Sequence, residues 1–113
     1  MILAPATWYA TVPGVTLTGP YNHHFIVDVG LAYLVSGLGL MAAVRLGDRR
    51  LAWLASAWPL SHASFHILLW LTHGLPHGAA LSAELIGVLG TALLAVFGAG
   101  GLPGQTRARG KMT

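Results

Sequence analysis

Histidine and carboxylate side chains recur one helical turn apart in this sequence. His62 and His66 lie inside the apolar segment PLSHASFHILLW, and His24 and Asp28 have the same spacing at the start of another apolar segment. Residues i and i+4 share one face of a helix, so each pair could bind one metal ion. Neutral imidazole suits Zn, Cu, Fe and Ni, and an added carboxylate widens that choice.

The composition predicts that these pairs lie in membrane-spanning helices. The chain has 113 residues, of which 55% are hydrophobic and 8% are charged, whereas soluble domains carry about 25% charged residues. Three apolar segments, residues 25–44, 51–72 and 79–100, reach the roughly 20 residues that a transmembrane helix needs. The expected fold is an all-α integral membrane bundle of three transmembrane helices. We expect residues 1–24 to form an interfacial arm at the outer face, with one short helix, and residues 101–113 to form a cytoplasmic basic tail.

Charge sets the expected orientation and narrows the function. The N-terminal arm and the second loop contain no Lys or Arg, and the basic residues form two clusters: Arg45, Arg49 and Arg50, and Arg107, Arg109 and Lys111. The positive-inside rule then predicts an N-terminus outside and a C-terminus in the cytoplasm, here of a bacterial inner membrane. So few charges argue against nucleic-acid binding, and the lack of cysteine excludes disulfides and thiolate metal sites.

All three predicted spans carry polar side chains near the outer face. At about 1.5 Å per residue, Asp28, His66 and Glu84 fall roughly 5–9 Å below that face and His62 falls roughly 15 Å below it. Inward-facing side chains at these depths could form one site for a transition metal ion such as Cu, Zn or Fe. The candidate ligands are His24, Asp28, His62, His66 and Glu84, with Glu84 either a ligand or a supporting carboxylate.

Other uses of the same side chains stay open. They could lock the helices together, since Asp28 and Glu84 could hydrogen-bond to His62 or His66 across helices. His62 could instead bind a haem or bacteriochlorophyll axially, with small residues nearby to admit a flat ring; covalent haem is excluded because no CxxCH is present. A proton path is disfavoured because the cytoplasmic halves of spans one and three lack ionisable groups. Hydrolytic catalysis is disfavoured because the sequence has no nucleophile elbow.

Small residues and one proline predict how the helices pack. His24, Asp28, Ala32 and Ser36 form one i+4 stripe, and Ala83, Gly87 and Thr91 form a row of small residues. Such rows allow transmembrane helices to approach closely. Pro59 removes a backbone donor and should kink or loosen the second span just before His62. His73 and His77 are expected to be solvated in a loop.

Residues 8–34, WYATVPGVTLTGPYNHHFIVDVGLAYL, resemble a group of small bacterial polytopic membrane proteins. The resemblance is carried by Gly19-Pro20-Tyr21-Asn22, His24-Phe25, Asp28-Val29-Gly30 and Tyr33-Leu34, followed by the histidine pair of the second span. It implies a helical bundle and the His/Asp positions, but it implies no reaction. Members of that group usually begin with a further apolar helix and often have Arg before the Asp, where this chain has Val27.

Together these patterns predict a membrane accessory protein rather than an enzyme. In the leading hypothesis it binds a transition metal ion near the outer face of the lipid bilayer. In the alternative it is a structural or assembly subunit of a larger photosynthetic, respiratory or oxygenase-like complex. Its expected partners are other membrane proteins or further copies of itself.

Overall fold

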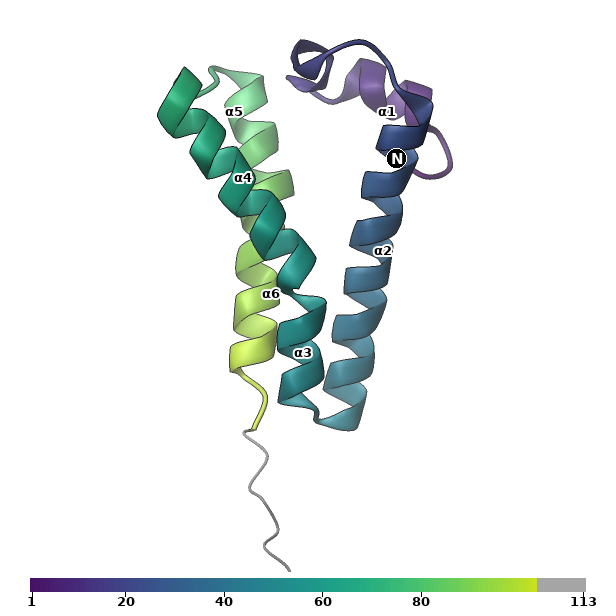
Figure 1. The fold of residues 1–113 in the computed structure, drawn as a ribbon, viewed down its shortest axis with the longest axis vertical. Coiled ribbons are helices and arrows are strands. Elements are labelled where there is room, and N and C mark those ends of the chain that lie inside the picture. The colour runs from purple at the N-terminus through teal and green to yellow at the C-terminus, as the bar shows by residue number, and fades with distance from the viewer. Residues whose placement is uncertain (104–113) are drawn as a thin grey trace, which may run out of the picture.

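The computed structural model describes residues 1–103, which form helical segments and no strands (Figure 1). In chain order these are α1 (Pro5–Thr11), the 3-10 helix η1 (Val15–Thr18), α2 (His23–Leu46), α3 (Arg49–Ala55), α4 (Ala57–His73), α5 (Ala79–Glu84), the π-helix η2 (Leu85–Gly90) and α6 (Thr91–Gly100). The all-α class predicted from the sequence is therefore confirmed. The basic cluster predicted for the C-terminal tail lies outside the described residues.

The longest helix, α2, has both ends fixed by local sequence. The Asn22 side chain accepts a hydrogen bond from the Phe25 backbone N–H at 3.1 Å, as its expected role of N-cap requires. Gly47 ends the helix with a φ of 63°, a left-handed conformation that glycine adopts without steric cost. Asp48 then caps α3 by accepting from the backbone N–H groups of Arg50 and Leu51. The chain thus reverses direction within two residues.

The second predicted span, residues 51–72, is not one continuous helix, and this corrects the sequence prediction. The chain turns at Ser56 and divides the span into α3, of 7 residues, and α4, of 17 residues. Pro59 explains the break, because it has no N–H to donate to the carbonyl four residues before it and its ring crowds that carbonyl. Proline is tolerated in the first turn of a helix, and Pro59 is the third residue of α4.

Within residues 1–103, two helices, rather than the three predicted, are each long and apolar enough to cross a membrane. They are α2, His23–Leu46, and the combined helix of α5, η2 and α6, Ala79–Gly100. Only 17% of the most apolar window of each helix is buried inside the protein. The core helix of a soluble protein would be mostly buried. These two helices instead present Leu, Val, Ile and Phe side chains outward along their length.

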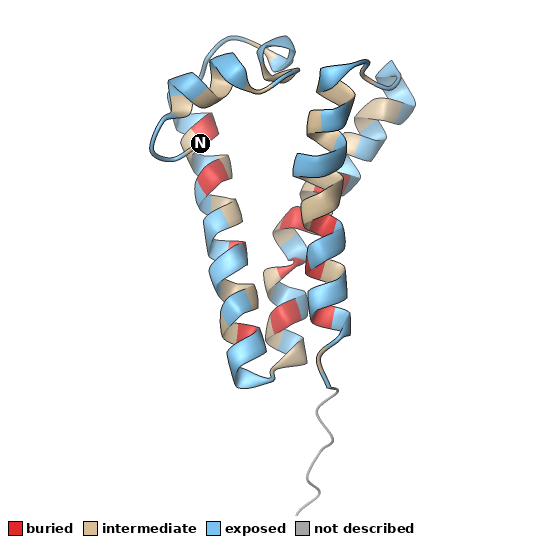
Figure 2. Cartoon of the chain, turned by 180° about the vertical axis from the view of Figure 1, so that it is seen from behind, coloured by how far each residue is buried: buried red, intermediate tan, exposed pale blue. Residues whose placement is uncertain are grey.

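Helix packing depends on small residues. In Figure 1, α3 lies between α2 and α6 at one end of the molecule, and α4 leans away from α2 toward the other end. The buried residues, red in Figure 2, lie mainly where α3, α4 and α6 meet. Ala43 of α2, Ala52 of α3 and Ala99 of α6 form a fully buried cluster. Small side chains of this kind let helices approach closely. The deepest row on the last helix is Ala92, Ala95 and Ala99, not the predicted row of Ala83, Gly87 and Thr91.

The N-terminal arm crosses the open end of the helices. Tyr9 donates a hydrogen bond to the Gly19 carbonyl at 2.6 Å, which ties α1 to the segment before α2. Gly14 has a φ of 87°, and a Cβ built there would lie 2.9 Å from the Cβ of Ala80 in α5. The arm therefore spans from α2 to α5, and only glycine fits at the point of contact.

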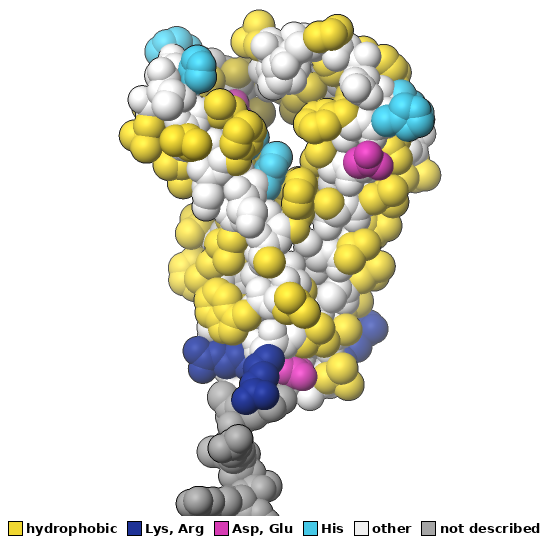
Figure 3. All heavy atoms as spheres, in the orientation of Figure 1, with side chains coloured by type: hydrophobic (Ala, Val, Ile, Leu, Met, Phe, Trp, Pro, Cys, Tyr) yellow, Lys and Arg dark blue, Asp and Glu magenta, His cyan; other side chains and the backbone are white. Residues whose placement is uncertain are grey.

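Charged side chains divide between the two ends. Arginine side chains gather at the end where α2 meets α3, whereas the histidines lie toward the end that carries the arm (Figure 3). The same view shows an opening between α2 and α4 near the arm. This is the distribution that the sequence predicted for Arg45, Arg49 and Arg50 and for the histidines.

Candidate functional site

Glu84 joins the last helix to α4 through two hydrogen bonds. Its Oε2 lies 3.2 Å from His66 Nδ1 and accepts from Trp70 Nε1 at 2.5 Å. His66 and Trp70 are one helical turn apart on α4, so both reach the same carboxylate oxygen. The side chains of His66 and Glu84 are 18% and 25% exposed, so protein covers most of each side chain.

The bond to Glu84 orients the His66 imidazole. When Glu84 is ionised its carboxylate can only accept, and Nδ1 then carries the proton of this contact. In the neutral ring, Nε2 then keeps its lone pair and is free to accept a proton or a metal ion. A histidine that ligates a metal commonly has its other nitrogen held by a carboxylate in this way.

His62 lies in a cluster of aromatic rings between α4 and α2. Its ring stacks on Trp58, with centroids 5.4 Å apart and planes at 18°. The Tyr33 ring, on α2, stands nearly perpendicular to the His62 ring, with centroids 5.7 Å apart. The ring of His66 lies 4.7 Å away. Both histidines of the HxxxH pair therefore face the protein interior, and each is partly buried.

Two donors in this cluster are buried without a hydrogen-bond partner among the described residues. They are Trp58 Nε1 and Tyr33 Oη. The Thr91 hydroxyl donates to the Gly87 and Val88 carbonyls of its own helix, so toward Tyr33 Oη, which it approaches, it can act only as an acceptor. Buried donors are normally paired, so each of these two groups calls for an explanation.

The other half of the predicted site lies apart from this cluster. His24 and Asp28 are both exposed, although Ser36 on the same stripe is buried and Ala32 is partly buried. The His24 ring has its nearest aromatic neighbour in His23, at 6.0 Å. His73 and His77 are exposed, as expected for solvated loop residues. Within residues 1–103, no three His, Asp or Glu side chains are grouped as a metal ion requires.

Sequence reasoning missed three residues of the cluster. Trp70 could have been found, because it follows His66 by four residues and so shares its face. Trp58 could have been found in the same way, because it precedes His62 by four residues on α4; Tyr33 could not, because its approach from α2 depends on how α4 leans after the break at Ser56. The π-helix η2 also went unpredicted. It follows Glu84 directly, and π segments within longer helices are frequent at functional sites.

No protein family, no curated protein and no solved structure matches this chain. The chemistry of the cluster is therefore the basis for assigning a function.

Proposed function

We propose that this protein is a small integral membrane subunit whose interhelical polar cluster fixes the geometry of a three-segment bundle. The observation that best supports membrane insertion is the exposure of apolar side chains along the two long helices, His23–Leu46 and Ala79–Gly100. In water, a contiguous surface of this kind would drive aggregation. In lipid it is the expected outer surface.

A third crossing by α3 and α4 together is part of this proposal. Residues 49–73 rise about 37 Å at 1.5 Å per residue, which exceeds the hydrocarbon core of about 30 Å. The turn at Ser56 is compatible with that depth because Ser56 is fully buried, and its Oγ bonds to the carbonyls of Ala52 and Ala95 at 2.8 and 3.3 Å. Irregular backbone is tolerated in a membrane only where protein covers it.

The polar groups near the arm fit a locking role. Glu84 holds α5 to α4 through two hydrogen bonds, and all three partners are partly buried. A protein of this size with so little buried core is suited to assemble with further helices, either of partner proteins or of other copies. The resemblance of residues 8–34 to small bacterial membrane proteins is in line with this proposal.

Labelling of single cysteines tests insertion and orientation. The chain has no cysteine, so each variant carries one reactive site. A membrane-impermeant maleimide applied to intact cells should label Thr16→Cys, in the arm, and should label Arg50→Cys only after permeabilisation. Recovery of the protein in the soluble fraction would refute insertion. Labelling of both sites, or of Arg50→Cys alone, in intact cells would refute the orientation.

The subunit role has its own test. Purification of the tagged protein in a mild detergent should yield other membrane proteins in fixed proportion, or a homo-oligomer by size-exclusion chromatography with light scattering. A monodisperse monomer without partners would count against it.

Metal binding is the second candidate, and the orientation of His66 favours it. With Glu84 ionised, the contact places the proton on Nδ1 and leaves Nε2 available, and the His62 ring is 4.7 Å from that of His66. A metal ion would need a further ligand beyond these two imidazoles, with Glu84 as support. His24 and Asp28 of the same chain lie apart from these imidazoles, so only those of a second copy in an assembly could join them. Axial binding of a haem or bacteriochlorophyll by His62 stays a prediction that the absorption spectrum of the purified protein checks.

Elemental analysis of detergent-purified protein tests the metal hypothesis. It predicts a transition metal near one equivalent per chain, lost in His66→Ala and kept in His77→Ala, which changes an exposed loop histidine. Equal, substoichiometric metal in the wild-type protein and both variants would overturn it.

A further inference from the structure

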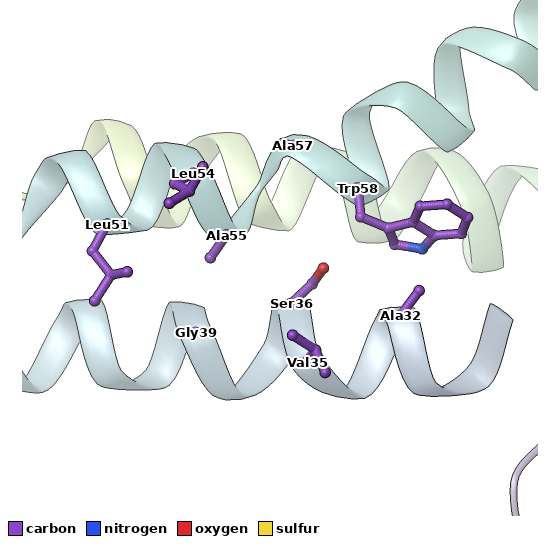
Figure 4. A pocket seen from close by; sticks show the side chains of 9 residues that line it. All are labelled: Ala32, Val35, Ser36, Gly39, Leu51, Leu54, Ala55, Ala57 and Trp58. Atoms are coloured by element: carbon purple, nitrogen blue, oxygen red, sulfur yellow. The ribbon is translucent and has the colours of Figure 1, made fainter. Parts of the chain in front are cut away.

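One side of α3 carries basic, aromatic and aliphatic side chains in order along the helix. Because successive helical residues are about 100° apart, this side consists of Arg49, Arg50, Trp53 and Leu54. Trp53 is 40% exposed and Leu54 is 72% exposed. Leu51 and Ala55 lie on the opposite side of α3 and point toward α2 across an apolar groove (Figure 4). The side that carries the arginines is therefore turned away from α2, and we call it the exposed side of α3.

The arginines of the exposed side have no acidic partner among residues 1–103. Within that part of the chain, the one ion pair joins His66 to Glu84. Asp48 precedes both arginines, but its Oδ1 accepts hydrogen bonds from two backbone N–H groups of α3. Arg45, in the last turn of α2, adds a further positive charge at the same end of the molecule. These guanidinium groups are therefore available to an anion from outside the protein.

The depths of these side chains match the parts of a phospholipid. Residues 49–73 span about 37 Å, which is about 7 Å more than the hydrocarbon core, so Arg49 lies in the headgroup region. Trp53 lies about 6 Å further along the axis of α3, at the boundary with the hydrocarbon, where indole rings concentrate. Leu54 follows it. The exposed side thus presents arginines to the phosphates, Trp53 to the glycerol esters and Leu54 to the acyl chains.

We propose that the exposed side of α3 binds an anionic phospholipid of the phosphatidylglycerol type. The planar guanidinium group can donate two parallel hydrogen bonds to a phosphate, and the Trp53 N–H can donate to an ester carbonyl. Clusters of basic residues beside membrane helices attract acidic lipid headgroups in this way. Phosphatidylcholine offers the same phosphate but adds a choline cation, which the arginines repel. This inference rests on the membrane insertion proposed above.

Native mass spectrometry of the protein released from detergent micelles tests this proposal, and its result does not depend on orientation in a membrane. The probes are phosphatidylglycerol and phosphatidylcholine with identical acyl chains, added in equal amounts. The wild-type protein should bind phosphatidylglycerol about 25-fold more tightly. That ratio is about fivefold for each arginine of the exposed side, since a basic residue near an acidic lipid surface contributes about 1 kcal/mol. Arg49→Gln combined with Arg50→Gln should bring the ratio close to one.

The matched control combines Arg107→Gln with Arg109→Gln, in the tail outside the described residues. It removes the same net charge and should leave the ratio unchanged. If the first double variant does not fold, Arg49→Gln or Arg50→Gln alone should lower the ratio about fivefold, whereas Arg107→Gln alone should not.

Two outcomes would overturn the proposal while leaving membrane insertion intact. One is a wild-type protein that binds the two lipids equally. The other is an equal loss in the exposed-side and tail variants, because it would show a response to net charge alone. Recovery of the protein in the soluble fraction would instead refute insertion.

Discussion

Removing the Glu84 carboxylate should separate α5 from α4 at the end that carries the arm. Glu84→Ala deletes both hydrogen bonds at once, and it leaves His66 Nδ1 and Trp70 Nε1 without an acceptor. Hydrogen bonds between membrane helices contribute about 0.6 kcal/mol on average and up to about 1.7 kcal/mol. The expected loss of stability for two bonds is therefore about 1–3 kcal/mol. Both bonds are to one oxygen, and the Glu84→Gln amide oxygen can accept both, so this variant should lose less than Glu84→Ala.

Steric trapping measures this loss directly. Streptavidin binds both of two biotin tags, placed on introduced cysteines in α2 and α6, only when the helices separate. His24→Ala is the control, because His24 is exposed and its nearest aromatic neighbour is His23 of its own helix; its effect should stay within about 0.5 kcal/mol. A double-mutant cycle of Glu84→Ala with His66→Ala should show coupling of at least about 0.5 kcal/mol. A Glu84→Ala variant as stable as His24→Ala, or a cycle without coupling, would refute the locking role.

Three further substitutions test the packing. Gly39→Ala places a Cβ 2.8 Å from that of Ala55 and should destabilise the bundle by about 1–3 kcal/mol. Gly37→Ala is the control and should be neutral. Equal unfolding free energies for the two variants would contradict the close approach of α2 to α3. Asp48→Ala removes the N-cap of α3 and should cost about 1 kcal/mol in the same assay, with no loss counting against the cap. Ser56→Ala removes the hydroxyl that bonds to two carbonyls and should cost about 1 kcal/mol, and a stability equal to that of the wild-type protein would show that neither bond matters.

The ends of the helices could be predicted because local chemistry sets them. The Asn22 cap satisfies a backbone N–H within its own turn, and the third apolar segment, residues 79–100, coincides with the helix Ala79–Gly100. Pro59 likewise predicted a defect in the second span. The sequence did not show that this defect would divide the span in two, because a kink and a break differ only in how neighbouring helices pack around it.

The candidate site was predicted in part. The spacing of His62 and His66 required them to share a face, and the depth of Glu84 matched that of His66. In the structure, His66 and Glu84 form a side-chain hydrogen bond. The same spacing argument applied equally to His24 and Asp28, yet both are exposed, because nothing within one helix fixes which of its faces meets a neighbour.

The sequence by itself determined the helical class, the apolar segments and the division of charge between the two ends. These depend on composition and on bonds within one or two turns. Only the tertiary structure decided which polar side chains meet, that Trp58 and Tyr33 lie together with unpaired donors, and that a groove remains between α2 and the α3–α4 junction. Those features depend on the angle at Ser56 and on contacts between small residues far apart in the chain, which no local pattern specifies.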